Sequence, residues 1–217
     1  MKFDTPATTN PIDQMKVVGK PTPRIEGPLK STGLAPYAYE HHTAVPNQAY
    51  GVAVGSGIAK GRIASMDLTD AQAAPGVIAI VTAENAGKLG QGKYNTAKLL
   101  AGPDIQHYPQ AIALVVAETF EQARAAAERV KVHYVPTEGA FDLARSRESA
   151  VEAKDQMADV SHGDFAAAFA AAPVQLDQTY TTPDQAHAMM EPFASMASWQ
   201  GDQLTLWTSN QMIDWSV

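Results

Sequence analysis

The clearest hydrophobic pattern lies in the middle of the chain, where three short segments of different periodicity follow one another. Residues 111–117 (AIALVVA) are apolar throughout and predict a strand, whereas residues 118–129 combine helix-forming residues with charges along one face. Residues 130–135 alternate between apolar and polar positions and predict a second strand. Thr119 precedes Gln122 by three residues, which predicts a capping box at the start of the helix. This strand–helix–strand unit indicates an α/β layer.

Three further strands are predicted before this unit. Residues 48–56 and 62–68 read as strands separated by a short Gly-containing connection. Residues 77–81 (VIAIV) form an uninterrupted apolar run, which is typical of a strand buried on both faces. Residues 83–110 are rich in Gly, Asn, Lys and Gln and are expected to form a long excursion with at most a short helix.

The pattern changes after residue 140. Residues 141–163 are polar and charged and predict a linker with a brief helical turn. After it, residues 164–171 predict an alanine-rich helix and residues 174–181 an alternating strand. Residues 194–199 and 203–208 predict a hairpin.

The sequence predicts an extended arm at the start of the chain and an incomplete helix at its end. Four prolines keep residues 1–23 from sustaining a helix, so an extended arm is expected there. Residues 211–215 look like the first turn of a helix that has no room to continue, and one turn is too short to be stable alone. We therefore expect an α+β (mixed α/β) chain in which a second domain begins and is not completed.

Composition and charge exclude several classes of protein. The 217 residues carry 16 Lys and Arg against 23 Asp and Glu, and a net charge of −7 argues against a general nucleic-acid binder. The chain has no cysteine, which excludes disulfides, thiolate nucleophiles and iron–sulfur ligation within it. No apolar run reaches the length of about 18 residues needed to cross a membrane, and residues 1–20 do not resemble a signal peptide. The cytoplasm is the default expectation, unless the chain is exported with a partner.

The short motifs in the chain favour structural roles. Residues 55–61 contain three glycines, but their spacing and the strand that follows do not match a dinucleotide-binding loop. His187 and Glu191 have the spacing of a helical metal or acid–base pair, yet Pro192 disfavours that helix, so a structural hydrogen bond is the favoured role for this pair. The three tryptophans are interpreted as core and interface packing. No Gly-x-Ser-x-Gly or His-Glu-x-x-His motif occurs.

Several segments together carry a more specific pattern. They are Arg24–Gly33 with Tyr37 and Tyr39, Ala74–Val77, Gln110–Thr119, His187–Pro192, the Trp199 strand and Thr208–Gln211. They resemble the α/β hammerhead domain and the opening of the molybdopterin-binding domain of the molybdenum-containing aldehyde oxidase and xanthine dehydrogenase family. In detail, residues 10–14 and 210–215 look most like the large subunit of bacterial three-subunit periplasmic aldehyde oxidoreductases.

The resemblance implies a domain plan and an activity. Residues 1–23 would be the arm, 24–140 the hammerhead domain, 141–163 the linker and 164–217 the first elements of the molybdopterin-binding domain. Enzymes of this kind oxidise aldehydes to carboxylic acids with water as the oxygen source, at molybdenum bound to molybdopterin cytosine dinucleotide. They pass electrons to an iron–sulfur subunit and a FAD subunit, and the iron–sulfur partner can carry a twin-arginine export signal. Oxidation of xanthine, N-heterocycles or carbon monoxide, or a non-catalytic module that docks a partner subunit, remain open alternatives.

The resemblance assigns one cofactor-binding residue and no catalytic or metal-ligating residue to this chain. Gln211 matches the family glutamine that hydrogen-bonds the apical oxo group of molybdenum, so it would orient the metal without ligating it. The family's glycine-rich cofactor segment and its general-base glutamate have no counterpart in these 217 residues. The chain alone is therefore expected to hold no cofactor and to be inactive.

Overall fold

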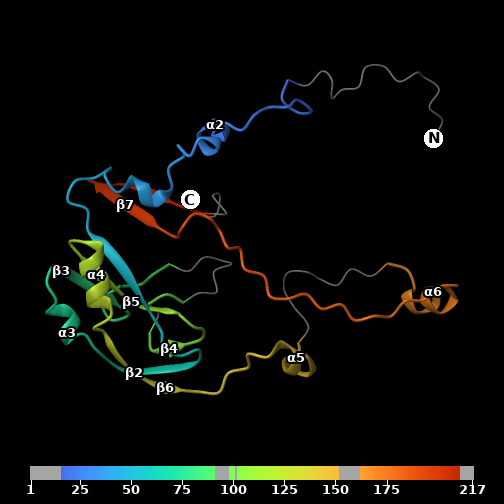
Figure 1. The fold of residues 1–217 in the computed structure, drawn as a ribbon. Coiled ribbons are helices and arrows are strands. Elements are labelled where there is room, and N and C mark those ends of the chain that lie inside the picture. Colours follow the sequence, from blue (N-terminus) through green and yellow to red (C-terminus); the bar gives the residue numbers. More distant parts are fainter. Residues whose placement is uncertain (1–15, 91–97, 101, 152–161, 211–217) are drawn as a thin grey trace. The chain divides into compact units, whose positions relative to one another are not determined.

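The computed structural model describes residues 16–90, 98–100, 102–151 and 162–210 (Figure 1). The chain divides into two compact units, one formed by Met1–Pro46 with Ala186–Val217 and the other by Asn47–Gln185. Each unit is described by itself below. Within the described residues, no helix is both long and apolar enough to cross a membrane.

The larger unit is built on an antiparallel three-stranded sheet with β5 (Ala111–Ala117) between β1 (Tyr50–Gly55) and β3 (Val77–Thr82). α4 (Phe120–Ala127) packs against this sheet beside α3 (Thr69–Gln72) (Figure 1). Small and β-branched side chains make the core because the helix must approach the sheet closely. The core residues are Ala71, Ala74, Ile80, Ala113, Val115 and Ala126.

The prediction that residues 77–81 form a strand is confirmed, but the prediction that this strand is buried on both faces is wrong. β3 lies at the edge of the sheet, and the side chain of Ile78 is 59% exposed. The central position belongs to β5, where four of the seven residues are buried and the other three are half-buried. An apolar run thus indicated a strand but did not reveal which strand lies at the centre.

A second three-stranded sheet completes the larger unit. β2 (Gly61–Asp67) lies between β4 (Asp104–Ile105) and β6 (Lys131–Pro136), and both pairings are antiparallel. β2 begins at Gly61 with φ +144°, where a Cβ would overlap the carbonyl oxygen of Val135. Glycine is therefore required for the close approach of β2 and β6.

The predicted capping box of α4 is confirmed. The Thr119 hydroxyl accepts a hydrogen bond from the Gln122 amide at 3.2 Å, and the Gln122 side chain accepts one from the Thr119 amide at 3.1 Å. Gly76, with φ +76°, lies so close that a Cβ there would overlap the side-chain amide of Gln122. Any side chain at position 76 would therefore clash with the capping box at the start of α4.

The chain that follows β6 holds short helices and one segment without regular structure. α5 (Leu143–Ser146) and the 3₁₀ turn η2 (Arg147–Ser149) lie in the predicted linker, and α6 (Phe165–Ala171) confirms the predicted alanine-rich helix. The strand predicted over residues 174–181 is not present. A strand needs a neighbour to satisfy its backbone groups, and no described segment pairs with this one.

The smaller unit combines an N-terminal segment with the last described strands. Its elements are α2 (Gly27–Ser31), the 3₁₀ turn η1 (Ala38–His41), β7 (Ser195–Gln200) and β8 (Gln203–Thr208). β7 and β8 form the predicted hairpin, with Gly201 at φ +61° in its turn. The η1 segment packs against both strands of this hairpin.

Candidate functional site

The open end of the β7–β8 hairpin is the candidate site, because it leads directly to the residues that the sequence singles out. Ser195 lies opposite Thr208, and their hydroxyl oxygens are 2.7 Å apart, so the two strand ends are joined by a side-chain hydrogen bond. The next residue, Ser209, has a buried hydroxyl with no hydrogen-bond partner among the described residues. Gln211, the predicted cofactor-binding residue, lies outside the described residues.

The η1 turn is attached to the hairpin unit through Glu191. The backbone amide of Ala38 donates a hydrogen bond to Oε1 of Glu191 at 2.9 Å, across 153 positions of the sequence. Glu191 is half-buried, whereas His187 is exposed. The structure does not bring His187 and Glu191 together as a metal or acid–base pair. The structural hydrogen bond predicted for this pair is confirmed for Glu191, whose partner is Ala38, and no such bond of His187 occurs among the described residues.

His41 makes a second attachment that sequence reasoning missed. Its imidazole stacks on the indole of Trp207, with ring centroids 5.9 Å apart and planes inclined by 24°. His42, the next residue, instead approaches Tyr39, with centroids 5.9 Å apart. Two adjacent histidines gave no indication of which one would contact a strand 166 residues away, so the sequence carried no usable signal for this pair.

The groups with displaced pKa values are two carboxyls and one ammonium group, none of which belongs to β7 or β8. The backbone amide of Thr69, which donates to Asp67 at 2.9 Å, lowers the pKa of that carboxyl. The hydrogen bond from Lys131 to Asp70 raises the pKa of the ammonium group. Glu26 has a lowered pKa because its own backbone amide and then Lys30 hydrogen-bond to it. All three groups are exposed, and their shifts reflect local surface bonding rather than a reactive centre.

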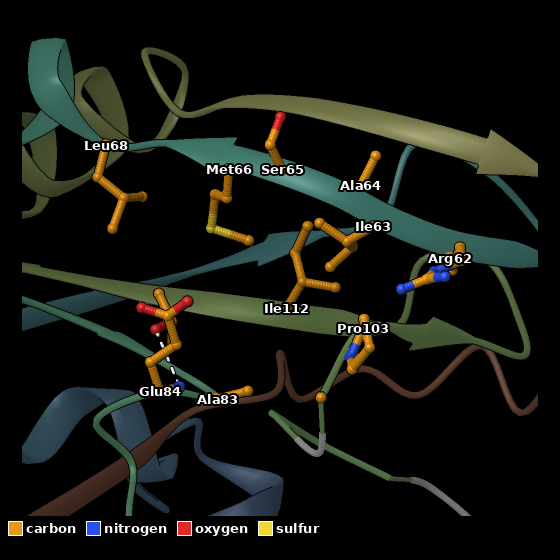
Figure 2. Close-up of a pocket in the computed structure, with 12 residues that line it drawn as sticks. Arg62, Ile63, Ala64, Ser65, Met66, Leu68, Ala83, Glu84, Pro103 and Ile112 are labelled. Atoms are coloured by element: carbon orange, nitrogen blue, oxygen red, sulfur yellow. Dashed lines mark hydrogen bonds between the residues drawn. The ribbon is translucent and has the colours of Figure 1, made fainter.

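A cavity of about 480 Å³ lies in the larger unit, between the second sheet and strand β5 (Figure 2). Its walls are mainly apolar, and Figure 2 shows Arg62 and Glu84 at opposite ends of it. Neither charged side chain forms an ion pair with a described residue. The backbone amide of Glu84 donates a hydrogen bond to the Thr82 hydroxyl at 3.3 Å, so this hydroxyl already has a partner. The apolar lining comes from Ile63, Met66, Leu68, Pro103 and Ile112.

The described residues fit a supporting role beside a cofactor and not the role of metal ligands. No cluster of three His, Cys, Asp or Glu side chains that could hold a metal occurs in the described part of the chain. The unpartnered hydroxyl of Ser209 is a buried polar group that still needs a hydrogen bond. The hairpin end can therefore offer polar groups to a neighbouring cofactor while other residues bind it.

Two family models match successive parts of the chain. Residues 34–138 match the a/b hammerhead domain of aldehyde oxidase and xanthine dehydrogenase, and residues 149–216 match a molybdopterin cofactor-binding domain. The hairpin described above lies in the second match. The two matches support the order of domains that the sequence pattern indicated.

Curated relatives carry related descriptions. The chain is 61% identical over 215 residues to the aldehyde oxidoreductase molybdenum-binding subunit PaoC of Escherichia coli (strain K12), and this alignment covers 99% of the chain and 29% of the relative. It is 27% identical over 207 residues to the nicotinate dehydrogenase large molybdopterin subunit of Eubacterium barkeri, covering 90% of the chain and 48% of the relative. The chain thus spans less than a third of the E. coli relative and about half of the second one.

Solved structures share the fold. The aldehyde oxidoreductase from Desulfovibrio gigas aligns with a TM-score of 0.67 at 22% identity, over 85% of this chain and 23% of that one. Quinoline 2-oxidoreductase from Pseudomonas putida 86 aligns with a TM-score of 0.65 at 24% identity, over 87% of this chain and 26% of that one. The predicted fold, a hammerhead domain followed by the start of a molybdopterin-binding domain, is confirmed.

Proposed function

The chain belongs to the aldehyde oxidase and xanthine dehydrogenase family, and from this premise we propose that it is the N-terminal part of the molybdenum-binding subunit of an aldehyde oxidoreductase. The observation that carries the proposal is the 61% identity to the E. coli molybdenum-binding subunit over 99% of the chain. Relatives that act on nicotinate or nicotine are 26–28% identical. Aldehydes are therefore the proposed substrates, ahead of N-heterocycles, xanthine or carbon monoxide.

The proposed cofactor is molybdenum bound to molybdopterin cytosine dinucleotide, held mostly by residues other than those of this chain. When bound, it supplies the oxidation of the aldehyde to the acid, with oxygen from water and electrons leaving to iron–sulfur and FAD partner subunits. The absence of cysteine in the chain agrees with clusters that belong to another subunit. The match of residues 149–216 to a molybdopterin cofactor-binding domain supports molybdopterin as the cofactor.

The role of this chain's own residues is to position one edge of the cofactor site. The Ser195–Thr208 hydrogen bond and the His41–Trp207 stack hold the hairpin end. From there, Gln211 would donate a hydrogen bond toward the metal centre, and Ser209 would satisfy its hydroxyl on the same side. Neither group ligates the metal or transfers a proton, so the chain by itself is proposed to be inactive.

The test uses the full-length subunit, expressed and purified with its partner subunits. We expect oxidation of aromatic and aliphatic aldehydes with a dye acceptor, about one molybdenum per subunit, and release of cytidine monophosphate on acid hydrolysis. The 217-residue chain alone should bind no molybdenum and show no turnover. A full-length subunit that contains no molybdopterin, together with a 217-residue chain that folds alone and captures the partner subunits, would favour the docking-module alternative.

The compartment follows from the partners in this proposal. The cytoplasm is the default for the chain taken alone, and export to the periplasm requires a partner subunit with a twin-arginine signal. Cell fractionation with the partner genes present and then deleted tests this dependence. Periplasmic activity that persists without the signal-bearing partner contradicts it.

A further inference from the structure

Residues 174–181 have the side-chain pattern of an amphipathic strand, but no described strand pairs with them. Val174, Leu176 and Tyr180 lie at even-numbered positions, where only Gln178 interrupts the apolar series, and they are 84%, 67% and 80% exposed. The odd-numbered positions all carry polar side chains, namely Gln175, Asp177, Thr179 and Thr181. In an extended backbone successive side chains point to opposite faces, so the three apolar groups share one face with Gln178, and the other face is polar throughout.

The backbone of this segment is equally unpartnered. No backbone hydrogen bond joins residues 174–181 to any other described residue. Backbone amides and carbonyls that become buried must be paired, so an extended segment that shows an apolar face needs a neighbour that supplies donors and acceptors as well as apolar surface. Another strand supplies both.

The start of the segment is anchored by its polar face. The side-chain amide of Gln175 donates to the carbonyl oxygen of Phe169 at 2.8 Å, at the end of α6. This bond uses the polar side of the segment and leaves the apolar side uncovered. Prolines at 173 and 183 bound the segment, which limits it to about the length of an ordinary strand and disfavours its joining a helix.

We propose that residues 174–181 form a β-strand that pairs with a strand from a part of the same subunit outside these 217 residues, and that its Val174–Leu176–Tyr180 face is buried there. This inference rests on the proposal that the chain is part of a longer molybdenum-binding subunit. The chain corresponds to 29% of the E. coli relative, so most of such a subunit is available to supply the neighbour. Val, Leu, Thr and Tyr at these positions favour a strand over a helix.

The first test is hydrogen–deuterium exchange on the full-length subunit purified with its partner subunits, compared with the 217-residue chain. We expect the amides of residues 174–181 to exchange on the order of 100-fold more slowly in the full-length subunit than in the short chain. Amides that exchange at the unprotected rate in both proteins overturn the proposal. Residues 195–208 serve as an internal reference, because their hairpin is formed in the structure.

The second test separates the two faces of the strand with a matched pair of variants. Leu176→Asp places a carboxylate on the apolar face, and Thr179→Asp places the same group on the polar face. We expect Leu176→Asp to abolish the protection and lower the yield of assembled complex about tenfold, while Thr179→Asp stays within about twofold of the parent protein. Equal effects of the two variants contradict the assignment of faces.

Two further readouts keep the result decisive. If Leu176→Asp yields no protein, Leu176→Ala is expected to assemble and to show partial loss of protection confined to residues 174–181; unchanged protection there contradicts the proposal. Exchange does not depend on turnover. A subunit with protected residues 174–181 but without aldehyde oxidation would therefore contradict the proposed activity and support the strand pairing. A subunit that oxidises aldehydes but leaves residues 174–181 unprotected would support the activity and contradict the strand pairing.

Discussion

The imidazole of His41 stacks on the indole of Trp207, and this contact joins η1 to β8 two residues before Ser209. The two rings come from positions 166 residues apart. This stack and the Ala38–Glu191 hydrogen bond connect η1 to β8 and to the segment before β7, and together they restrict the movement of the hairpin end. Both attachments can be removed without touching the residues proposed to face the cofactor.

We expect His41→Ala to loosen the hairpin end. Loss of an aromatic pair costs about 0.5–1.5 kcal/mol, and the half-buried position of both rings favours the lower half of that range. Hydrogen exchange of the amides in residues 203–208 measures this local stability in the full-length subunit. His41→Phe should restore protection because it keeps the stack, and His42→Ala should leave it unchanged because that ring faces Tyr39. A His42→Ala effect as large as that of His41→Ala would contradict the assignment.

Glu191→Ala is expected to release η1 from the same unit. It removes the acceptor for the Ala38 amide and leaves that donor without its bond, at a cost of about 1–2 kcal/mol. Exchange of the amides in residues 38–41 provides the measurement. Glu191→Gln retains a side-chain oxygen, so we expect it to keep most of the protection. Equal loss in both variants would mean that charge, and not the hydrogen bond, is what matters at this position.

Local features of this chain were predictable from its sequence because their causes are local. The Thr119–Gln122 box and the β7–β8 hairpin with Gly201 in its turn each depend on residues within a few positions of one another. The sequence indicated that Glu191 would make a structural hydrogen bond, but it did not indicate that Ala38 would be the donor. The latter depends on which distant segment folds against the hairpin.

The remaining differences between the predictions and the structure depend on residues that are far apart in the sequence. Ile78 is exposed because β3 is an edge strand, and strand order is set by the whole sheet. Residues 174–181 carry a strand pattern, but a pattern cannot form a strand without a neighbour. Gln211 was chosen by resemblance, and its assignment remains a prediction.

The carboxyl of Asp67 should make the start of α3 sensitive to acid. Its pKa is lowered from the ordinary value of 3.8 because the charged form accepts the hydrogen bond from Thr69. A carboxyl with a folded pKa below its unfolded pKa contributes stability that is fully present above pH 3.8 and is lost as the pH falls through the lower, folded value. We expect NMR titration to show the Thr69 amide shifting together with the Asp67 carboxyl. In Asp67→Asn this coupled transition should vanish; its persistence would assign it to another group.

Gly76→Ala should destabilise the larger unit more than Gly87→Ala, although both glycines have a positive φ, +76° and +69°. Each alanine incurs the left-handed backbone cost of about 1 kcal/mol. Only at Gly76 would the new Cβ also overlap the Gln122 amide and displace it from its bond to Thr119, adding about 1 kcal/mol from the lost cap; at Gly87 no described atom lies within 4 Å of a Cβ. Urea denaturation followed by circular dichroism measures the difference. Because the excess cost arises at Gln122, it should shrink in a Gln122→Ala background, and an excess that remains undiminished there would place the strain elsewhere.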